Sequence, residues 1–264
     1  MPGSHLVPFP SGAVPAPQRS SRRKSVRHSA SRAYGKTLVS TVANGGAGGS
    51  EHNNAGNGGT ATASTVVTGI ENVQGQSSAA GGSGANCSTG FDCPGGRGGN
   101  ATASTTVTAG AGSANANSTA TGGSGGFVSP AFPQAGKGGN ATATATSAAF
   151  GDNSAAASSY ATAGLGGAGI ELGPGGTPGS ANATSNATVL GPGQASAQAT
   201  VFGGASAGAA TATSTSGEGA GRSVSASGVA PVGGNASALT LSNFGGSGFG
   251  LPGITAEQYF QRGL

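Results

Sequence analysis

Side chains that perform chemistry are scarce in this sequence. Charged residues make up 7% of the 264 residues, and the chain holds three His, two Cys and no Trp. Acid-base catalysis, nucleophilic catalysis and metal binding depend on such side chains. The two Asp residues, Asp92 and Asp152, are too few for a series of calcium sites, and no pair of carboxylates is placed for hydrolysis. We therefore expect a noncatalytic protein without a cofactor or a bound metal.

Large apolar residues are also few. Leu, Ile, Val and Phe together number 36, which is below about one fifth of the chain, the level at which an ordinary packed core becomes hard to build. Most of the 34% of residues counted as hydrophobic are therefore alanine. No stretch approaches the roughly 18 consecutive apolar residues of a membrane-spanning helix, so we expect no transmembrane segment. The alternation of apolar strands and helices that is typical of α/β enzymes is missing as well.

Charge is unevenly distributed along the chain. The first 43 residues hold seven of the eleven basic residues and no acid, whereas the remainder holds four bases and seven acids. Frequent prolines, followed by a run rich in Ser and Arg, predict a disordered basic arm over residues 1–43. Three interpretations stay open: an organelle transit peptide, a charge-based contact with phosphate-bearing polymers, or a solvated tail. Because its aromatics are only Phe9 and Tyr34, we expect no specific nucleic-acid binding.

The rest of the chain is an internal repeat with an offset of 40 residues. Segment 58–65 matches segment 98–105, and the register continues in 138–144 and, more loosely, in 179–184. A second alternating segment occupies the other half of each unit, so each unit holds two candidate strands. After about residue 190 the alternating stretches recur at shorter intervals. We expect units of about 40 residues over 44–190, shorter degenerate repeats over 191–243, and a C-terminal cap or tail over 244–264.

Alternation with a period of two predicts strands with one buried and one exposed face. Ala61, Ala63 and Val67 form the row expected to point inward, and Thr62 and Thr68 belong to the opposite row. The Gly-Gly pairs are expected at turns, because glycine adopts positive φ without steric cost. Strands separated by glycine turns at a regular interval are typical of a parallel β-solenoid. We therefore predict an all-β, thin, Gly/Ala/Thr-rich parallel β-solenoid-like repeat.

A core of alanine is energetically weak. Burying one methyl group gains about 0.8 kcal/mol, whereas ordering one residue costs about 1.5 kcal/mol. Such a fold therefore needs nearly complete backbone ladders and a close approach of its sheets. The alternative is a largely disordered low-complexity chain, or a spurious reading frame without a specific function.

The only two cysteines lie in one glycine-rich connection. Cys87 and Cys93 have five residues between them, and a local disulfide fits this spacing. A disulfide would imply an oxidising compartment, and two free thiols are the alternative. A zinc site is not expected, because the three His lie outside the repeat and two thiols lack further ligands.

Asn-x-Ser/Thr sequences recur in the body, for example at Asn100 and Asn140. In a eukaryotic secreted protein such sequences are acceptors for sugars. In a chain this rich in Asn, Ser and Thr, chance and copying of the repeat also produce them.

A ladder of threonines is the most distinctive exposed feature. If the units stack in register, Thr62, Thr102 and Thr142 place hydroxyl and methyl groups in one row on a flat face. Tripeptides such as Thr60-Ala61-Thr62 resemble the Thr-x-Thr surface of β-solenoid antifreeze proteins. The resemblance implies that the face holds ordered water and binds ice, and carbohydrate is a second ligand for a Thr/Asn face. An ordinary polar outer face is the alternative.

The Gly-Gly-x-Gly-Gly spacing, as in residues 95–99, resembles the glycine-rich repeats of bacterial surface and secreted proteins, among them the mycobacterial PGRS-type repeats. Those repeats usually follow a helical N-terminal domain, and no such pattern precedes residue 44 in this sequence. The resemblance implies a protein that is secreted or at the cell surface. We expect a noncatalytic structural protein that acts through self-association or adhesion, with a surface polymer or ice as the partner of its Thr/Asn face.

Overall fold

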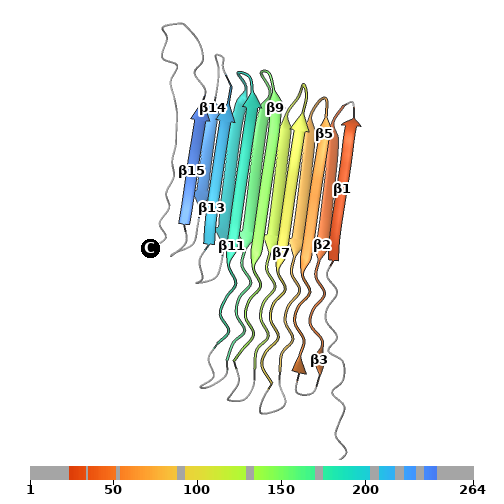
Figure 1. Cartoon of the computed structure of the whole chain (residues 1–264), viewed down its shortest axis with the longest axis vertical. Helices are drawn as coiled ribbons and strands as arrows, with labels where there is room; N and C mark the ends of the chain where they lie inside the picture. The colour runs from red at the N-terminus through yellow and green to blue at the C-terminus, as the bar shows by residue number, and fades with distance from the viewer. Residues whose placement is uncertain are drawn as a thin grey trace, which may run out of the picture.

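The chain forms a two-sheet parallel β-solenoid, which confirms the predicted fold class (Figure 1). In the computed structural model no helix occurs among the described residues. The structure describes residues 24–33, 35–51, 54–87, 93–128, 134–169, 175–202, 208–217, 223–229 and 235–242. The predicted C-terminal cap or tail over 244–264 lies outside these residues, as do residues 1–23 of the predicted basic arm.

Each coil contributes one strand to each of two sheets. The seven-stranded sheet contains, in spatial order, β1 (Lys24–Ala33), β5 (Ala61–Gly69), β7 (Ala101–Ala109), β9 (Ala141–Phe150), β11 (Ala181–Leu190), β13 (Gly208–Ser216) and β15 (Asn235–Ser242). The six-stranded sheet contains β2 (Thr37–Asn44), β6 (Val73–Ala80), β8 (Ala114–Thr121), β10 (Ser154–Thr162), β12 (Gln194–Phe202) and β14 (Ser223–Val229). A small antiparallel pair joins β3 (Ser50–Glu51) to β4 (Asn54–Ala55).

The 40-residue repeat of the sequence is the pairing register of the seven-stranded sheet. Ala61 pairs with Ala101, Ala101 with Ala141, and Ala141 with Ala181. The next step is shorter, because Ala181 pairs with Gly208. The coils therefore keep their stacking where the sequence loses its exact period, and the expected short repeats over 191–243 coincide with β12 to β15.

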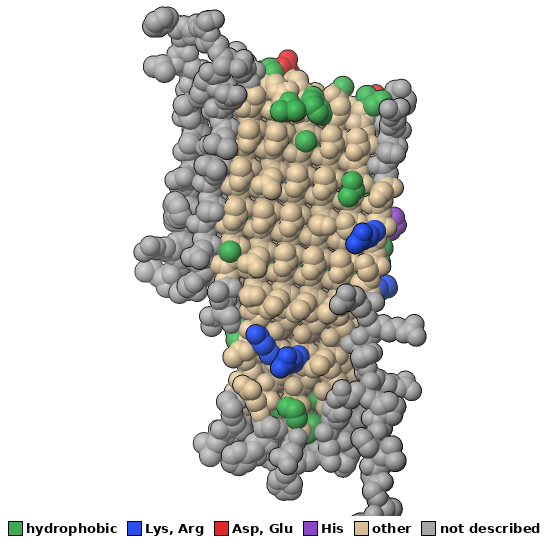
Figure 2. Space-filling model, viewed as in Figure 1, with side chains coloured by type: hydrophobic (Ala, Val, Ile, Leu, Met, Phe, Trp, Pro, Cys, Tyr) green, Lys and Arg blue, Asp and Glu red, His purple; other side chains and the backbone are tan. Residues whose placement is uncertain are grey.

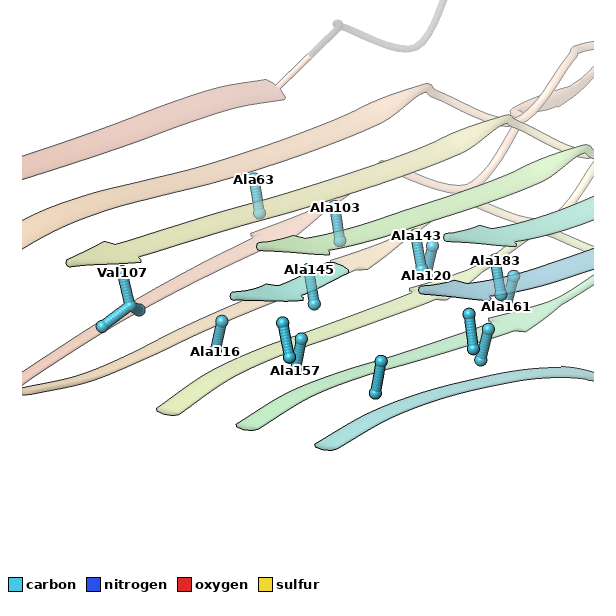
Figure 3. Packing of buried hydrophobic residues seen from close by; sticks show 14 of the residues in the cluster. Ala63, Ala103, Val107, Ala116, Ala120, Ala143, Ala145, Ala157, Ala161 and Ala183 are labelled. Carbon is cyan, nitrogen blue, oxygen red and sulfur yellow. The ribbon is translucent and has the colours of Figure 1, made fainter. Parts of the chain in front are cut away.

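Alanine methyl groups fill the space between the two sheets (Figure 3). Ala63, Ala103 and Ala143 lie in one row of the seven-stranded sheet, and each is at most 1% exposed. Ala116 and Ala157 come from the facing sheet and are equally buried. Burial alternates residue by residue along the strands, as in the pattern of β9. The period-two prediction of the inward row is therefore confirmed.

A row of buried hydroxyl groups crosses the middle of this alanine core. Thr65 donates to the Oγ1 of Thr41 over 2.9 Å, and Ser77 donates to the Oγ1 of Thr65 over 2.9 Å. One coil further, Ser118 donates to the Oγ1 of Thr105, again over 2.9 Å. Each hydroxyl has a single proton, which it shares with a backbone carbonyl of a facing strand, for example Ser77 with Ser104 over 2.7 Å. The hydroxyls are thus buried without losing their partners, and they link the two sheets.

The glycine-rich connections form a second module, a bundle of extended segments that continues the strands (Figure 1). Their backbone N–H groups donate to neighbouring segments at intervals of three residues: Gly122 to Thr162, Gly125 to Leu165 and Val128 to Ala168. Burial follows the same period, since Arg97 and Asn100 are exposed while Gly96 and Gly99 are buried. A three-residue repeat bonded between segments is characteristic of polyproline II geometry.

Glycine is required in the bundle because the segments touch backbone to backbone. A Cβ at Gly99 would overlap the carbonyl oxygen of Gly59 and lie 2.6 Å from its carbonyl carbon. Gly139 has the same relation to Gly99, one coil further along. Two of every three residues face such neighbours, and the third points outward, which explains the Gly-Gly-x pattern. The expectation that these pairs form positive-φ turns is wrong: among described glycines, positive φ occurs at Gly35, Gly151 and Gly191.

Pro178 marks the last layer of the bundle. In earlier coils the equivalent residues Gly58, Gly98 and Gly138 each donate their N–H group to the next layer, to Arg97, Lys137 and Thr177. Proline has no N–H group, so the final layer carries no donor at this position. After it the connection between β12 and β13 is short, and the coils continue as sheets alone.

The boundary of the predicted basic arm is wrong. Residues 24–43 fall within the arm that is expected to be disordered, yet β1 and β2 form the first coil of the solenoid. Lys24 and Arg27 are exposed, whereas Val26 packs against the alanine core. The sequence of β1 contains Lys24, Arg27 and Arg32, and basic residues are compatible with an edge strand, where charged side chains reach water.

Candidate functional site

The outer surface of the seven-stranded sheet is a threonine face. Its outward positions on β5, β7, β9, β11 and β13 hold thirteen threonines, all fully or partly exposed. They are Thr62, Thr68, Thr102, Thr106, Thr108, Thr142, Thr144, Thr146, Thr184, Thr188, Thr211, Thr213 and Thr215. We call this surface the Thr face. Because threonine is β-branched, it suits a strand, and its position opposite alanine in the alternation turns it outward.

The Thr face is ordered in two directions. Across the strands, Thr62 pairs with Thr102 and Thr102 with Thr142, so the three residues expected to form a ladder occupy adjacent positions. A second row continues from Thr144 to Thr184 and Thr211. Parallel strands set a spacing of about 4.8 Å across the sheet and about 6.6 Å between alternate residues along a strand. The result is a grid of hydroxyl and methyl groups.

Among the described residues, charge is confined to the borders of the Thr face. Figure 2 shows rows of side chains that are neither charged nor hydrophobic, with few coloured residues among them. Arg27 is exposed on the edge strand β1, and Arg97 and Lys137 are exposed in the bundle. Two large apolar residues, Phe150 and Leu190, pair with each other at the end of the strands. The centre of the face therefore presents hydroxyl and methyl groups and holds no charged side chain.

The outer surface of the six-stranded sheet is chemically different. Four amide side chains occupy adjoining positions, because Gln74 pairs with Asn115 and Gln76 with Asn117. A further amide, Gln198, accepts a hydrogen bond of 3.2 Å from the hydroxyl of Tyr160. We call this surface the amide face. The sequence-based expectation is of one Thr/Asn face and misses this second surface. Gln and Asn alternate with small residues in 74–76 and 115–117, and this alternation indicates a separate amide surface.

Asparagine side chains in the connections bind the backbone of the next coil. The Oδ1 atoms of Asn100 and Asn140 accept from the N–H groups of Asn140 and Ser180, each over 2.9 Å. Asn57 does the same for Arg97 over 2.8 Å. At these three places the amide oxygen takes the position of a backbone acceptor for a residue that lies outward or partly outward in the bundle. The Asn-x-Ser/Thr sequences at Asn100 and Asn140 thus have a structural role that the sequence analysis missed.

Cys87 and Cys93 are joined by a disulfide, with their Cα atoms 6.0 Å apart. Both are buried in a small cluster with Val128 and Ala135 at the far end of the bundle. Cys87 also forms an isolated parallel bridge with Val128 of the next coil. The disulfide therefore links the two described parts of one glycine-rich connection.

The described residues form neither a metal site nor a membrane-spanning helix. Nowhere among them do three or more His, Cys, Asp or Glu side chains gather in a way that would hold a metal ion. In the same part of the chain there is no helix of the length and apolarity needed to cross a membrane.

The Thr face and the amide face are thus the candidate sites of this solenoid. Comparison of the chain with family models, curated proteins and solved structures yields no match.

Proposed function

We propose that this chain is a noncatalytic structural protein of secreted material or of the cell surface, and that it acts by adhesion. The observation that carries the proposal is the register of its outer faces, in which like side chains repeat from strand to strand. A flat, uncharged surface of this kind makes many weak contacts at once with an extended, regular partner. Repeat proteins commonly use such extended surfaces for binding.

The disulfide between Cys87 and Cys93 supports this location. Disulfides form and persist in oxidising environments and are rare in a reducing cytosol. A buried alanine core with glycine backbone contacts also resists the loss of any single side-chain contact, because most of its bonds are between backbone groups. Both properties suit a protein exposed to the outside of a cell.

Self-association is expected at one edge of the solenoid rather than the other. The edge strand β1 carries Lys24 and Arg27, and charges on an edge strand oppose pairing with another chain. The strands β13, β14 and β15 at the opposite edge hold no charged residue. Pairing of β15 with β15 of a second copy would give a closed twofold dimer.

A lysine on β15 is therefore expected to weaken self-association. We expect Leu239→Lys in the full chain to lower the dimerisation constant about tenfold, because the edge would then carry a charge in each copy. Light scattering during size-exclusion chromatography over a range of concentrations measures this. Ser29→Lys on β1 is the matched control and should leave the mass unchanged. A wild-type chain that stays monomeric at every concentration would contradict edge pairing.

Ice binding is a second candidate function, favoured specifically by the Thr grid. Hydroxyl groups at regular spacing can order water, and the methyl groups between them limit competing hydrogen bonds. The in-register row of Thr62, Thr102 and Thr142 is uninterrupted. The face is also held rigid from beneath by the alanine core and the hydroxyl row.

Bulky side chains in the Thr row should abolish ice binding if the Thr face is the ice-binding surface. The double variant Thr102→Tyr/Thr142→Tyr keeps residues that suit a strand but breaks the flatness of the grid. We expect a complete loss of thermal hysteresis relative to the wild type, measured on single ice crystals. Ser158→Tyr on the amide face is the control and should retain the activity. Equal hysteresis in all three proteins would assign ice binding elsewhere, and none in the wild type would remove this candidate.

A further inference from the structure

The amide face contains a continuous polar row that crosses five strands. Ser40 pairs with Gln76, Gln76 with Asn117, Asn117 with Ser158, and Ser158 with Gln198. We call these five residues the amide row. At a strand spacing of about 4.8 Å the row is about 19 Å long, and it runs perpendicular to the strands. Its side chains are exposed or partly exposed.

The row supplies hydrogen-bond donors and acceptors side by side. Each primary amide offers two donors and one acceptor oxygen, and each serine hydroxyl offers one donor and two lone pairs. Asn117 lies at the centre of the row, between Gln76 and Ser158.

Tyr160 borders the row. It pairs with Thr119, two residues along the strand from the row, and its hydroxyl donates to the Oε1 of Gln198. This bond holds the ring towards β12, where it is partly exposed. An aromatic ring beside amide and hydroxyl groups combines an apolar surface for C–H groups with polar groups for hydroxyls. That combination fits a sugar ring, which has both kinds of surface.

The absence of charge on the amide face indicates which kind of polymer it can bind. The outward positions of β2, β6, β8, β10 and β12 hold no charged residue. A polyanion would meet no positive charge on this face to compensate its own, whereas a neutral polysaccharide needs no such charge. The Thr face has no such row, because its outward amides on β5 to β13 are Asn182 and Asn186 of β11, and each pairs with a threonine of β9 rather than with another amide.

We propose that the amide row binds a neutral polysaccharide that lies across the strands, with Gln76 and Asn117 bonding its hydroxyls and Tyr160 packing against a sugar ring. This goes beyond adhesion as proposed above, since it assigns a ligand class to a surface other than the Thr face. The polysaccharide extends over several coils, so the strength of binding comes from repetition.

Native affinity electrophoresis of the full chain in gels with hydroxyethylcellulose or dextran tests the proposal. We expect the wild type to be retarded by at least one of the two polymers. Gln76→Ala/Asn117→Ala should lower the affinity about tenfold, and Tyr160→Ala should do likewise. Tyr160→Phe should retain most of the binding, because the ring remains. Gln194→Ala is the matched control, since Gln194 is an exposed amide on the same face outside the row.

Three results would overturn the proposal. The first is no retardation of the wild type by either polymer, and the second is equal retardation of the double variant, with folding of each variant checked by circular dichroism. The third is a change in dimerisation caused by the double variant without polymer, which would assign the row to a second copy of the chain. In each case the Thr face can still be tested by its own variants, so a failure of the amide row would not contradict adhesion through the Thr face.

Discussion

Replacing Gly139 by alanine is expected to destabilise the solenoid by about 3 kcal/mol or more. The new Cβ would overlap the carbonyl oxygen of Gly99 and lie 2.7 Å from its carbonyl carbon. Both are backbone atoms, and Gly139 is itself fixed by bonds to Gly123 and Gly164. The neighbouring segment cannot move without breaking its own backbone hydrogen bonds, so the overlap cannot be relieved without a loss of stability. Urea unfolding followed by far-UV circular dichroism measures the loss.

Gly175→Ala is the matched control for this prediction. It lies in the same bundle, but a Cβ there would meet nothing closer than the carbonyl oxygen of Gly167 at 3.6 Å. Its φ is not positive, and alanine reduces the entropy of the unfolded chain, so we expect a change within about 1 kcal/mol. Equal stability of the two variants would show that the glycine segments do not pack as a bundle.

The second large effect is expected from neighbouring substitutions on β9. Ala143 is 1% exposed between Ala103 and Ala183, and a leucine there would force the two sheets apart. We expect Ala143→Leu to cost about 3 kcal/mol or more, because the core has no space for three further carbon atoms. Thr142→Leu, one residue away on the exposed side, should change stability by about 0.5 kcal/mol or less. Thermal and urea unfolding of both variants provide the comparison.

This pair of variants tests the orientation of the whole sheet. A strand that slipped by one residue would exchange its buried and exposed faces. The result that contradicts the structure is therefore a destabilising Thr142→Leu beside a tolerated Ala143→Leu. Similar small effects of both would indicate that the strands are not packed against each other at all.

Much of the fold follows from simple periodicity. The offset of 40 residues predicted the register of β5, β7 and β9, and the alternation of alanine with threonine predicted which side is buried. Parity alone also places Thr65 and Thr105 in the inward row, where the structure has them, although polarity suggests the outside. Their burial depends on partners in the facing sheet, such as Thr41 and Ser118, which no local pattern indicates.

The role of the glycine-rich connections, in contrast, could not be predicted from the sequence. A Gly-Gly pair is compatible with a turn or with close contact between backbones, and the sequence offers no choice between the two. Contacts such as those of Gly99 with Gly59 and Gly139 arise between segments that are 40 residues apart. The boundary at residue 43 was misplaced for a related reason, since β1 is ordered by pairing with β5 despite its charge.

The candidate surfaces divide in the same way. The ladder of Thr62, Thr102 and Thr142 could be anticipated from one repeat and its offset, because neighbouring coils place equal residues side by side. The amide row could be anticipated only in part: Gln and Asn alternate visibly in 74–76 and 115–117, but Gln76, Asn117 and Gln198 become neighbours only through pairing in the six-stranded sheet. By itself the sequence determined the strand period, the inward methyl groups and the scarcity of reactive side chains, since these depend on neighbours along the chain. Tertiary structure alone decided the glycine bundle, the buried hydroxyl row and the contrast between the two faces, because each requires contacts between residues in different coils.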